Sequence, residues 1–336
     1  MWRDAMKKKK IRWGAIVLWI FAFVFIIAIP SCFQDSFATG MVCLAIAAIL
    51  VFLGYRSFSK GKKAAAKERE ARIATIRKKA DAEKARQAEE ERHRVYVDGR
   101  KKEFAADLDS IPMVDIPLSA KKATRQHVSD LEDIRFTNIT RSTVIDGLFP
   151  FVVIDTETTG LKPAGNDIIE VSAIRFEKGF QPVSCFTTLL KPRNPIPEEA
   201  TRVNHITDDM VVGKPSFSQI AEAFSAYISG CNVVGHNLEF DLKFVYACGA
   251  TLPEKKRFYD TLMLAKRTLT CPRSTEWDEV EQKTVTVDFW DVEDYKLTTL
   301  CEYYDIYRSD AHRSLSDCYA TALLFENLIE DKLNKS

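Results

Sequence analysis

The chain of 336 residues lacks the cysteine and histidine groupings that bind zinc or build a disulfide framework. Its eight cysteines include no Cys-x-x-Cys pair, and its five histidines are not grouped with cysteines at zinc-ligand spacing. Scattered cysteines in a chain with a large apolar core are typical of reduced, buried thiols. This usage favours a cytosolic location for the folded part.

The sequence also lacks an excess of charge of either sign. Its formal net charge is +1, so the whole molecule is not a polycation and its charge alone does not indicate nucleic-acid binding. The length is enough for one ordinary domain with appendages, or for two small domains. The charge is unevenly distributed along the chain, and that distribution is informative.

Two stretches near the N-terminus contain no charged residue, namely residues 13–34 and 36–55. A membrane-spanning helix needs about 20 apolar residues, so we predict a transmembrane helical hairpin with spans of about 13–33 and 37–55. Lysines and arginines flank both outer ends, whereas the turn carries only Asp35. The positive-inside tendency therefore places both termini, and the domain that follows, on the cytoplasmic face of a cell membrane. The alternatives are a cleaved signal peptide and burial of both stretches in a soluble core.

Residues 57–107 contain few large apolar side chains and are dominated by alanine, lysine, arginine and glutamate, which favour helix. Opposite charges recur four apart, as in Lys79/Glu83 and Arg86/Glu90. A sustained apolar seam for a coiled coil is missing, so a solvated single-helix stalk is predicted. A loose oligomeric helix, and basic residues resting on anionic lipid, are the alternatives. Residues 108–148 are interpreted as a linker.

The pattern changes from residue 149 onward. Short apolar runs such as residues 151–154, and the alternating run of residues 168–176, are interleaved with amphipathic segments such as residues 217–228 and 314–333. Strand pairs followed by interleaved helices predict an α/β domain with a mixed sheet over residues 149–333.

Acidic residues stand at three ends of these predicted elements. Asp155 and Glu157 close the first strand, where alternation places both carboxylates on one face. Asp241 falls in the first turn of a helix, and Asp317 follows His312 by five residues near the start of the last helix. Clustered carboxylates repel one another, and a hard divalent cation such as Mg²⁺ or Mn²⁺ would remove that cost. A lone Asp-x-Glu could equally be a helix cap or a turn.

These three motifs resemble those of the DEDD exonuclease superfamily, in the branch with a catalytic histidine that includes the epsilon subunit of DNA polymerase III, ribonuclease T and oligoribonuclease. Asp155 and Glu157 match the first motif, Asn237 with Phe240 and Asp241 the second, and His312 with Asp317 the third. Secondary matches occur in the same order at residues 203–210, 260–262 and 295–300. The resemblance covers about residues 149–331 and implies a ribonuclease H-like mixed β-sheet flanked by helices.

The resemblance implies a mechanism with two metal ions. Asp155, Glu157, Asp241 and Asp317 would hold both ions, and His312 would act as general base because its ordinary pKa suits proton transfer near neutrality. Thr158, Gly160, Leu161 and Phe240 would contact the terminal nucleotide, with core packing as the alternative for Leu161 and Phe240. His236 is expected to be structural, whereas His205 could approach the substrate.

Two positions depart from the family pattern. Ser314 stands where the family often has alanine, and residues 270–294 form a longer connection than usual. Residues 283–292 alternate, so the longer connection could add a hairpin near the site or form a surface excursion.

The sequence therefore predicts a divalent-metal-dependent 3′→5′ exonuclease, tethered to a lipid bilayer, that shortens single-stranded DNA or RNA from a free 3′ end to nucleoside 5′-monophosphates. A membrane scaffold that binds nucleic-acid ends without cutting is the alternative from a different class. The catalytic residues do not distinguish DNA from RNA, because the 2′-hydroxyl is recognised by pocket shape. Oligomeric state is not predicted.

Overall fold

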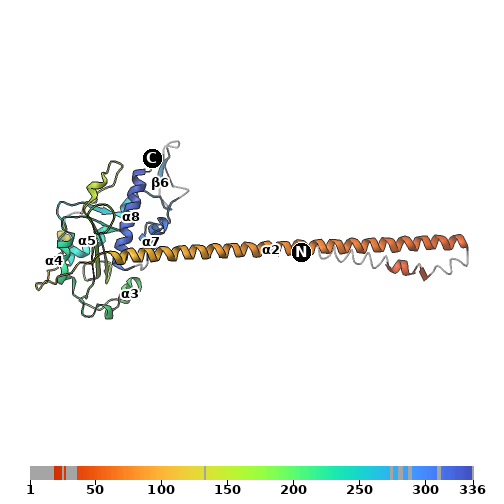
Figure 1. Ribbon diagram of the computed structural model, residues 1–336, viewed down its shortest axis with the longest axis horizontal. Coiled ribbons are helices and arrows are strands. Elements are labelled where there is room, and N and C mark those ends of the chain that lie inside the picture. The colour runs from red at the N-terminus through yellow and green to blue at the C-terminus, as the bar shows by residue number, and fades with distance from the viewer. Residues whose placement is uncertain are drawn as a thin grey trace. The chain divides into compact units, whose positions relative to one another are not determined.

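The computed structural model describes residues 19–24, 26–27, 36–131, 134–272, 275–278, 283–286, 290–308 and 312–334. The chain divides into two compact units, Met1–His93 and Arg94–Ser336, and each is described by itself. Figure 1 shows the chain, with most of its longer helices and the strand β6 labelled. In chain order they are α2 (Phe37–Ser110), η1 (Val128–Asp130), η2 (Ile145–Leu148), β1 (Phe151–Thr158), β2 (Ile168–Phe176), β3 (Ser184–Leu189), α3 (Glu198–Asn204), η3 (Asp208–Val211), α4 (Phe217–Ile228), β4 (Asn232–Gly235), α5 (Leu238–Ala247), β5 (Phe258–Asp260), α6 (Thr261–Ala265), β6 (Thr275–Asp278), β7 (Lys283–Thr286), α7 (Leu297–Tyr303) and α8 (Ser314–Asn334).

In the first unit, α2 is long and apolar enough at its start to cross a membrane, and 17% of its most apolar window is buried. Trp19 lies in a helical stretch of residues 19–24, and a Cβ added at Gly54 on α2 would lie 3.3 Å from the indole nitrogen of Trp19. Ala22 and Ala47 are also buried, which fits close packing of helices through small residues. Most of the first predicted span lies outside the described residues, so the two-helix hairpin stays a prediction.

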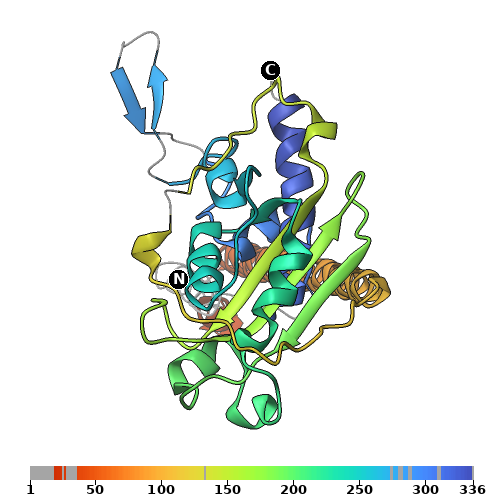
Figure 2. The ribbon, with the colours of Figure 1, turned by 90° about the vertical axis from the view of Figure 1, so that its left-hand side faces the viewer.

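The second unit is built on a five-stranded mixed sheet with the strand order β3-β2-β1-β4-β5. Strand β1 pairs antiparallel with β2 and parallel with β4, and β4 pairs parallel with β5. A mixed sheet covered by helices was predicted from the alternation of strand and helix patterns, and this part of the fold prediction is confirmed. Figure 2 shows the sheet with helices packed on it.

Both faces of the sheet are buried, and β1 shows why. Phe151 and Val153 pack into a core cluster with α8, whereas Val152 and Ile154 pack into a second cluster with α4 and α5. All four side chains have at most 1% exposure, which explains why β1 reads as a continuous apolar run. Continuing the alternation, Asp155 and Glu157 fall on the α8 face and Thr156 on the α5 face.

Residues 111–131 and 134–147, which belong to the segment 108–148 interpreted from sequence as a linker, pack against the sheet domain and will be called the strap. Its backbone pairs with β3 through Met113 and Cys185, and with β5 through Phe136 and Phe258. Phe104, near the end of α2, is also buried and lies 5.0 Å, ring centroid to ring centroid, from Tyr319 of α8. The second compact unit therefore begins well before the predicted exonuclease domain; the predicted boundaries themselves stay predictions.

The long connection between α6 and α7 contains a small two-stranded antiparallel sheet of β6 and β7. Its register pairs Thr275 with Thr286 and Asp278 with Lys283. Within the alternating stretch of residues 283–292, Lys283–Thr286 forms the second of these strands.

Candidate active site

The end of β1 and the first turn of α8 bring three carboxylates together. One oxygen each from Asp155, Glu157 and Asp317 lie within 4.8 Å of one another. The two β1 residues share a face because they are two positions apart, and Asp317 is one turn into the helix that covers that face. Asp317 is buried, and Asp155 and Glu157 are half-buried. The sequence motifs from opposite ends of the domain therefore converge.

Asp241 approaches the same strand from the other helix layer. It lies in the first turn of α5, is buried, and its Oδ1 accepts a hydrogen bond of 2.7 Å from Thr156 Oγ1. The preceding N-cap residue, Asn237, has a left-handed φ of 57°, which turns the chain sharply from β4 into the helix. The negative charge of Asp241 raises the pKa of Asp155, which lies near the end of β1.

Burial and mutual repulsion raise the pKa of these carboxyl groups. Burial first, and then the charges of Asp317 and Glu170, raise the pKa of Glu157 to about 8. Burial raises the pKa of Asp241 to about 7, against the hydrogen bond from Thr156. The pKa of Asp155 is likewise raised well above its ordinary value, by burial and by neighbouring Asp241. The site thus carries more negative charge than its own surroundings compensate.

Asp317 has a buried cationic partner. Arg308, whose side chain is 6% exposed, donates a short hydrogen bond from Nη1 to Asp317 Oδ1, and its Nη2 donates to Thr298 Oγ1 at 2.7 Å. Burial raises the pKa of Asp317, while Arg308 opposes that rise. The Arg308 guanidinium therefore holds one oxygen of the Asp317 carboxylate in place.

His312 lies next to this arrangement, immediately before α8. It is exposed, and its backbone has a left-handed φ of 63°. Its proximity lowers the pKa of Asp317. An exposed imidazole beside a metal-ligating type of carboxylate is placed suitably to exchange a proton with solvent or substrate.

Glu170 is a further acid beside the site, 4% exposed, that the sequence motifs did not identify. It lies on β2 and accepts hydrogen bonds from Arg313 Nη2 at 2.7 Å and from the backbone N–H of Ser314 at 2.8 Å. These contacts tie the middle of the sheet to the residues that directly follow His312. An acid within the otherwise uncharged run of residues 168–174 was the only signal of it in the sequence.

Asn204, at the end of α3, was also missed. It is 2% exposed, its Oδ1 accepts from the backbone N–H of Ile206 at 3.0 Å, and its side-chain hydrogen bond to Glu157 lowers the pKa of that acid. It lies within residues 203–210, one of the secondary matches to the family pattern.

The predicted nucleotide contacts differ in their exposure. Leu161 is 85% exposed in the connection between β1 and β2, and the hydroxyl of Thr158 donates to the Gly160 carbonyl at 2.8 Å. Phe240, in contrast, packs partly against the core, with its ring 4.8 Å from that of Phe244. Leu161 is therefore available for contact, and Phe240 has a packing role in addition to any contact with substrate.

Gly160 has a geometric reason to be glycine. A Cβ at this position would meet Oδ1 of Asn166 at 2.6 Å, which is closer than a side chain tolerates. Asn166 in turn donates from Nδ2 to the Lys162 carbonyl at 2.8 Å. The connection that carries Leu161 is thus compact, because Asn166 packs against Gly160 and bonds to Lys162 within it.

The remaining two histidines of the domain lie in different environments. Nδ1 of His236 lies 2.9 Å from the hydroxyl of Thr261, and burial lowers the pKa of His236 to about 4. His205 is exposed and caps α3 with a left-handed φ of 59°. His236 is half-buried, and its structural role stays a prediction.

The donor set fits a divalent cation. Carboxylate oxygens are the preferred ligands of Mg²⁺ and Mn²⁺, and three of them lie within bridging distance of a common centre. The raised pKa values of Asp155, Glu157 and Asp241 show the uncompensated charge that such a cation would neutralise. Arg308 supplies only part of this compensation, through Asp317.

Comparison with known proteins identifies a family and several relatives. The RNase_T family, described as exonuclease, matches residues 152–325. DNA polymerase III subunit epsilon of Treponema pallidum is 46% identical over 98 residues, which are 29% of this chain and 45% of that protein. The 3′-5′ exonuclease DinG of Bacillus subtilis is 33% identical over 185 residues, 54% of this chain and 18% of that protein. The chain spans less than half the length of these two relatives.

Solved structures of exonucleases also match this chain. Exonuclease X in complex with 5′ overhanging duplex DNA is 24% identical, with a TM-score of 0.39, over 54% of this chain and 91% of that chain. E. coli exonuclease I in complex with a dT13 oligonucleotide is 22% identical, with a TM-score of 0.41, over 53% of this chain and 40% of that chain.

Proposed function

The chain belongs to the exonuclease family, and we propose that it hydrolyses single-stranded DNA or RNA from the 3′ end in a divalent-metal-dependent reaction on the surface of a membrane. The observation that carries this proposal is the convergence of Asp155, Glu157 and Asp317 within 4.8 Å, with His312 beside them. Neither a scaffold nor a simple end-binding module requires buried carboxylates with raised pKa values next to an exposed imidazole.

In this proposal Asp155, Glu157, Asp241 and Asp317 hold two Mg²⁺ or Mn²⁺ ions. Bound divalent ions of this kind lower the pKa of a coordinated water and stabilise negative charge on the leaving oxygen. The task of the four carboxylates is to fix the ions relative to the substrate phosphate. Thr156 and Arg308 contribute by orienting Asp241 and Asp317 through hydrogen bonds.

His312 acts as the general base in this scheme. It accepts the proton of the attacking water, and its exposure lets it pass that proton to solvent before the next cycle. Attack on the last phosphodiester then releases a nucleoside 5′-monophosphate and leaves a shortened strand with a new 3′-hydroxyl.

Thr158, Gly160, Leu161 and Phe240 are proposed to receive the terminal nucleotide. The exposed Leu161 side chain is available to insert beside the last base, and Phe240 is one position before Asp241 on α5. A wedge of this kind favours a frayed or single-stranded end, because unstacking a paired base costs free energy.

The N-terminal unit is proposed to tether the domain to a bilayer through two spans, with both termini cytoplasmic. The apolar start of α2 and the adjoining helical stretch around Trp19 support this proposal. The charged part of α2 after residue 56 would then hold the domain away from the lipid surface. DNA is the first polymer to test, because several relatives are named as parts of DNA polymerases.

The test uses the full chain in detergent with 5′-labelled single-stranded DNA and RNA, in Mg²⁺, Mn²⁺ or chelator. We expect a metal-dependent ladder that shortens from the 3′ end and is absent with Asp155→Ala. Equal shortening by the variant would assign the activity to a contaminant. Binding of the oligonucleotides without any shortening would instead favour the scaffold that binds ends without cutting them.

A further inference from the structure

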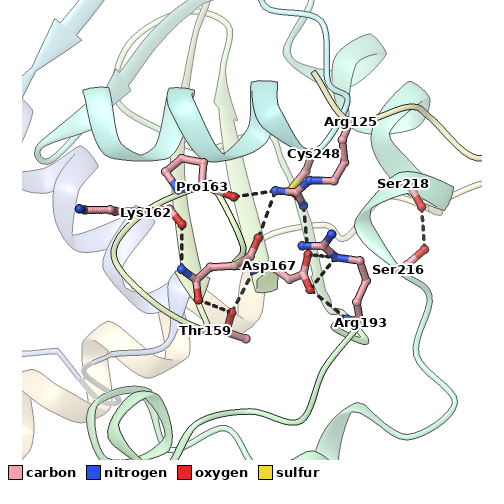
Figure 3. A network of polar contacts seen from close by, with 10 residues as sticks. Arg125, Thr159, Lys162, Pro163, Asp167, Arg193, Ser216, Ser218 and Cys248 are labelled. Carbon is pink, nitrogen blue, oxygen red and sulfur yellow. Dashed lines mark hydrogen bonds and ion pairs between the residues drawn. The ribbon is translucent and has the colours of Figure 1, made fainter. Parts of the chain in front are cut away.

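The strap contributes one arginine to the connection that carries Leu161. Arg125 lies outside residues 152–325, the part that matches the exonuclease family. Figure 3 shows its guanidinium inserted between the backbone of residues 163–166 and the Asp167 carboxylate. Its Nη2 donates to the carbonyls of Pro163 and Asn166 at 2.6 and 3.2 Å, and its Nη1 donates to Asp167 Oδ1 at 3.1 Å.

Asp167 is held from a second side, so the arrangement is a clamp. Arg193, just after β3, donates from Nε to Asp167 Oδ1 at 2.8 Å and from its backbone N–H to Oδ2 at 2.9 Å. The backbone N–H of Asp167 donates to the Thr159 hydroxyl at 3.0 Å, and Thr159 N–H donates to the Asp167 carbonyl at 2.9 Å. Both ends of the Leu161 connection are thereby joined at Asp167, which is 9% exposed.

The strap on either side of Arg125 is held by contacts with α4 and with the end of α5. The backbone N–H of Ala123 donates to the Ser218 carbonyl of α4, and Gln126 Nε2 donates to the carbonyls of Tyr246 and Ala250 at 3.0 Å each. Gly249 permits this close approach, because a Cβ there would meet Ala123 Cβ at 2.8 Å and its φ is +104°. These contacts hold the backbone on either side of Arg125 in place.

We infer that Arg125 is a positioning residue through which the strap sets the conformation of residues 159–167, and so the affinity for the 3′-terminal nucleotide. This inference rests on the proposed function, because Leu161 is assigned there to the terminal nucleotide. A planar guanidinium with three acceptors at fixed positions restricts the connection more than a single donor does. Without Arg125, the exposed Leu161 would sample more conformations and each binding event would have to order them.

The experiment compares Arg125→Gln with Lys122→Gln in the full chain. Lys122 is an exposed cation three residues away on the strap, so both variants lose one positive charge and the control keeps the clamp. We expect Arg125→Gln to raise KM for single-stranded DNA about tenfold and to change kcat less than about twofold, since it removes hydrogen bonds to a charged donor. The KM of Arg125→Lys should lie between those of the unsubstituted chain and Arg125→Gln, because an ammonium cannot reach all three acceptors.

A double-mutant cycle separates positioning from general stabilisation. If Arg125 acts through Leu161, Arg125→Gln has little further effect on KM in a Leu161→Ala background. Equal effects of Arg125→Gln in both backgrounds, or an unchanged KM, would overturn the inference. Thermal unfolding of each variant identifies a variant that fails to fold, and Arg125→Lys then replaces it in the cycle.

Hydrogen–deuterium exchange of residues 159–167 provides a readout that does not depend on catalysis. Faster exchange in Arg125→Gln than in Lys122→Gln is expected, together with weaker binding of a labelled oligonucleotide in chelator. Unchanged exchange would refute the clamp even in a fully active enzyme. An inactive wild-type protein whose exchange and binding respond as expected would refute the proposed hydrolysis and leave the clamp intact.

Discussion

Glu157 on β1 lies directly opposite Glu170 on β2, and the two acids have different partners. Glu170 accepts from the Arg313 side chain and from the Ser314 backbone, whereas Glu157 faces Asp155 and Asp317. Like charges opposite each other on a sheet are destabilising unless one is compensated. The sheet thus contains one acid whose charge is matched by protein groups and one whose charge is left for a cation.

This difference predicts how stability depends on pH in chelator. The pKa of Glu157 is raised from 4.5 to about 8, and that of Asp241 from 3.8 to about 7. The folded state therefore binds these protons more tightly than the unfolded state. The contribution of these two protonated carboxyl groups to the free energy of unfolding is fully present below about pH 4 and is lost as pH rises through about 8. We expect the thermal midpoint to fall by about 5 °C or more between pH 5 and pH 8.5.

Adding Mg²⁺ should reverse that fall, and more strongly at high pH, since binding requires deprotonated carboxylates. Differential scanning fluorimetry with and without chelator measures both effects. The matched variant is Glu157→Gln, which should weaken the pH dependence and the response to Mg²⁺ together. A midpoint that rises steadily from pH 5 to 8.5 in chelator would contradict the raised pKa values.

Glu170→Gln tests the compensated acid. The variant keeps the shape but leaves Arg313 facing a neutral amide, so we expect a loss of about 1–3 kcal/mol in the free energy of unfolding. Because the same contacts hold the start of α8, kcat should also fall while Mg²⁺ affinity changes little. Chemical denaturation and Mn²⁺ titration provide the two measurements. A large loss of metal affinity with unchanged stability would instead assign Glu170 to the metal ligands.

Much of the site could be predicted because its motifs are local. Alternation along β1 places Asp155 and Glu157 on one face, and one turn of helix places Asp317 at the start of α8. Glu170 and Arg125 could not be found in this way. Arg313 is 143 positions from Glu170, and Arg125 is 42 positions from Asp167, so no short pattern connects either pair.

The same distinction applies to the fold. The apolar run of residues 151–154 and the alternating run of residues 168–176 were predicted as strands of a mixed sheet, and the structure confirms both strands. The strap contains only short apolar stretches, and its order comes from backbone hydrogen bonds to β5 and α4 and from its contact at Gly249. Such tertiary contacts leave no periodic signal in the segment that makes them.

His312→Gln should separate proton transfer from metal binding. A neutral amide cannot accept the proton of the attacking water, so we expect kcat to fall about 100- to 10,000-fold. Mn²⁺ affinity and oligonucleotide affinity should stay within about twofold, because His312 is exposed and outside the carboxylate group. The check is single-turnover cleavage beside isothermal titration. His205→Gln is the control, and an equal loss in that variant would assign the proton-transfer role elsewhere.

The last prediction concerns the membrane. In vesicle flotation the full chain should rise with lipid and remain bound after high-salt and carbonate washing, whereas residues 94–336 should stay at the bottom. The reason is that the apolar start of α2 inserts into hydrocarbon, and salt does not weaken that burial. Salt-sensitive flotation on anionic vesicles alone would mean that the basic residues after Tyr55 rest on lipid head groups without any span. A full chain that never floats, with or without anionic lipid, would show that the domain works away from the membrane.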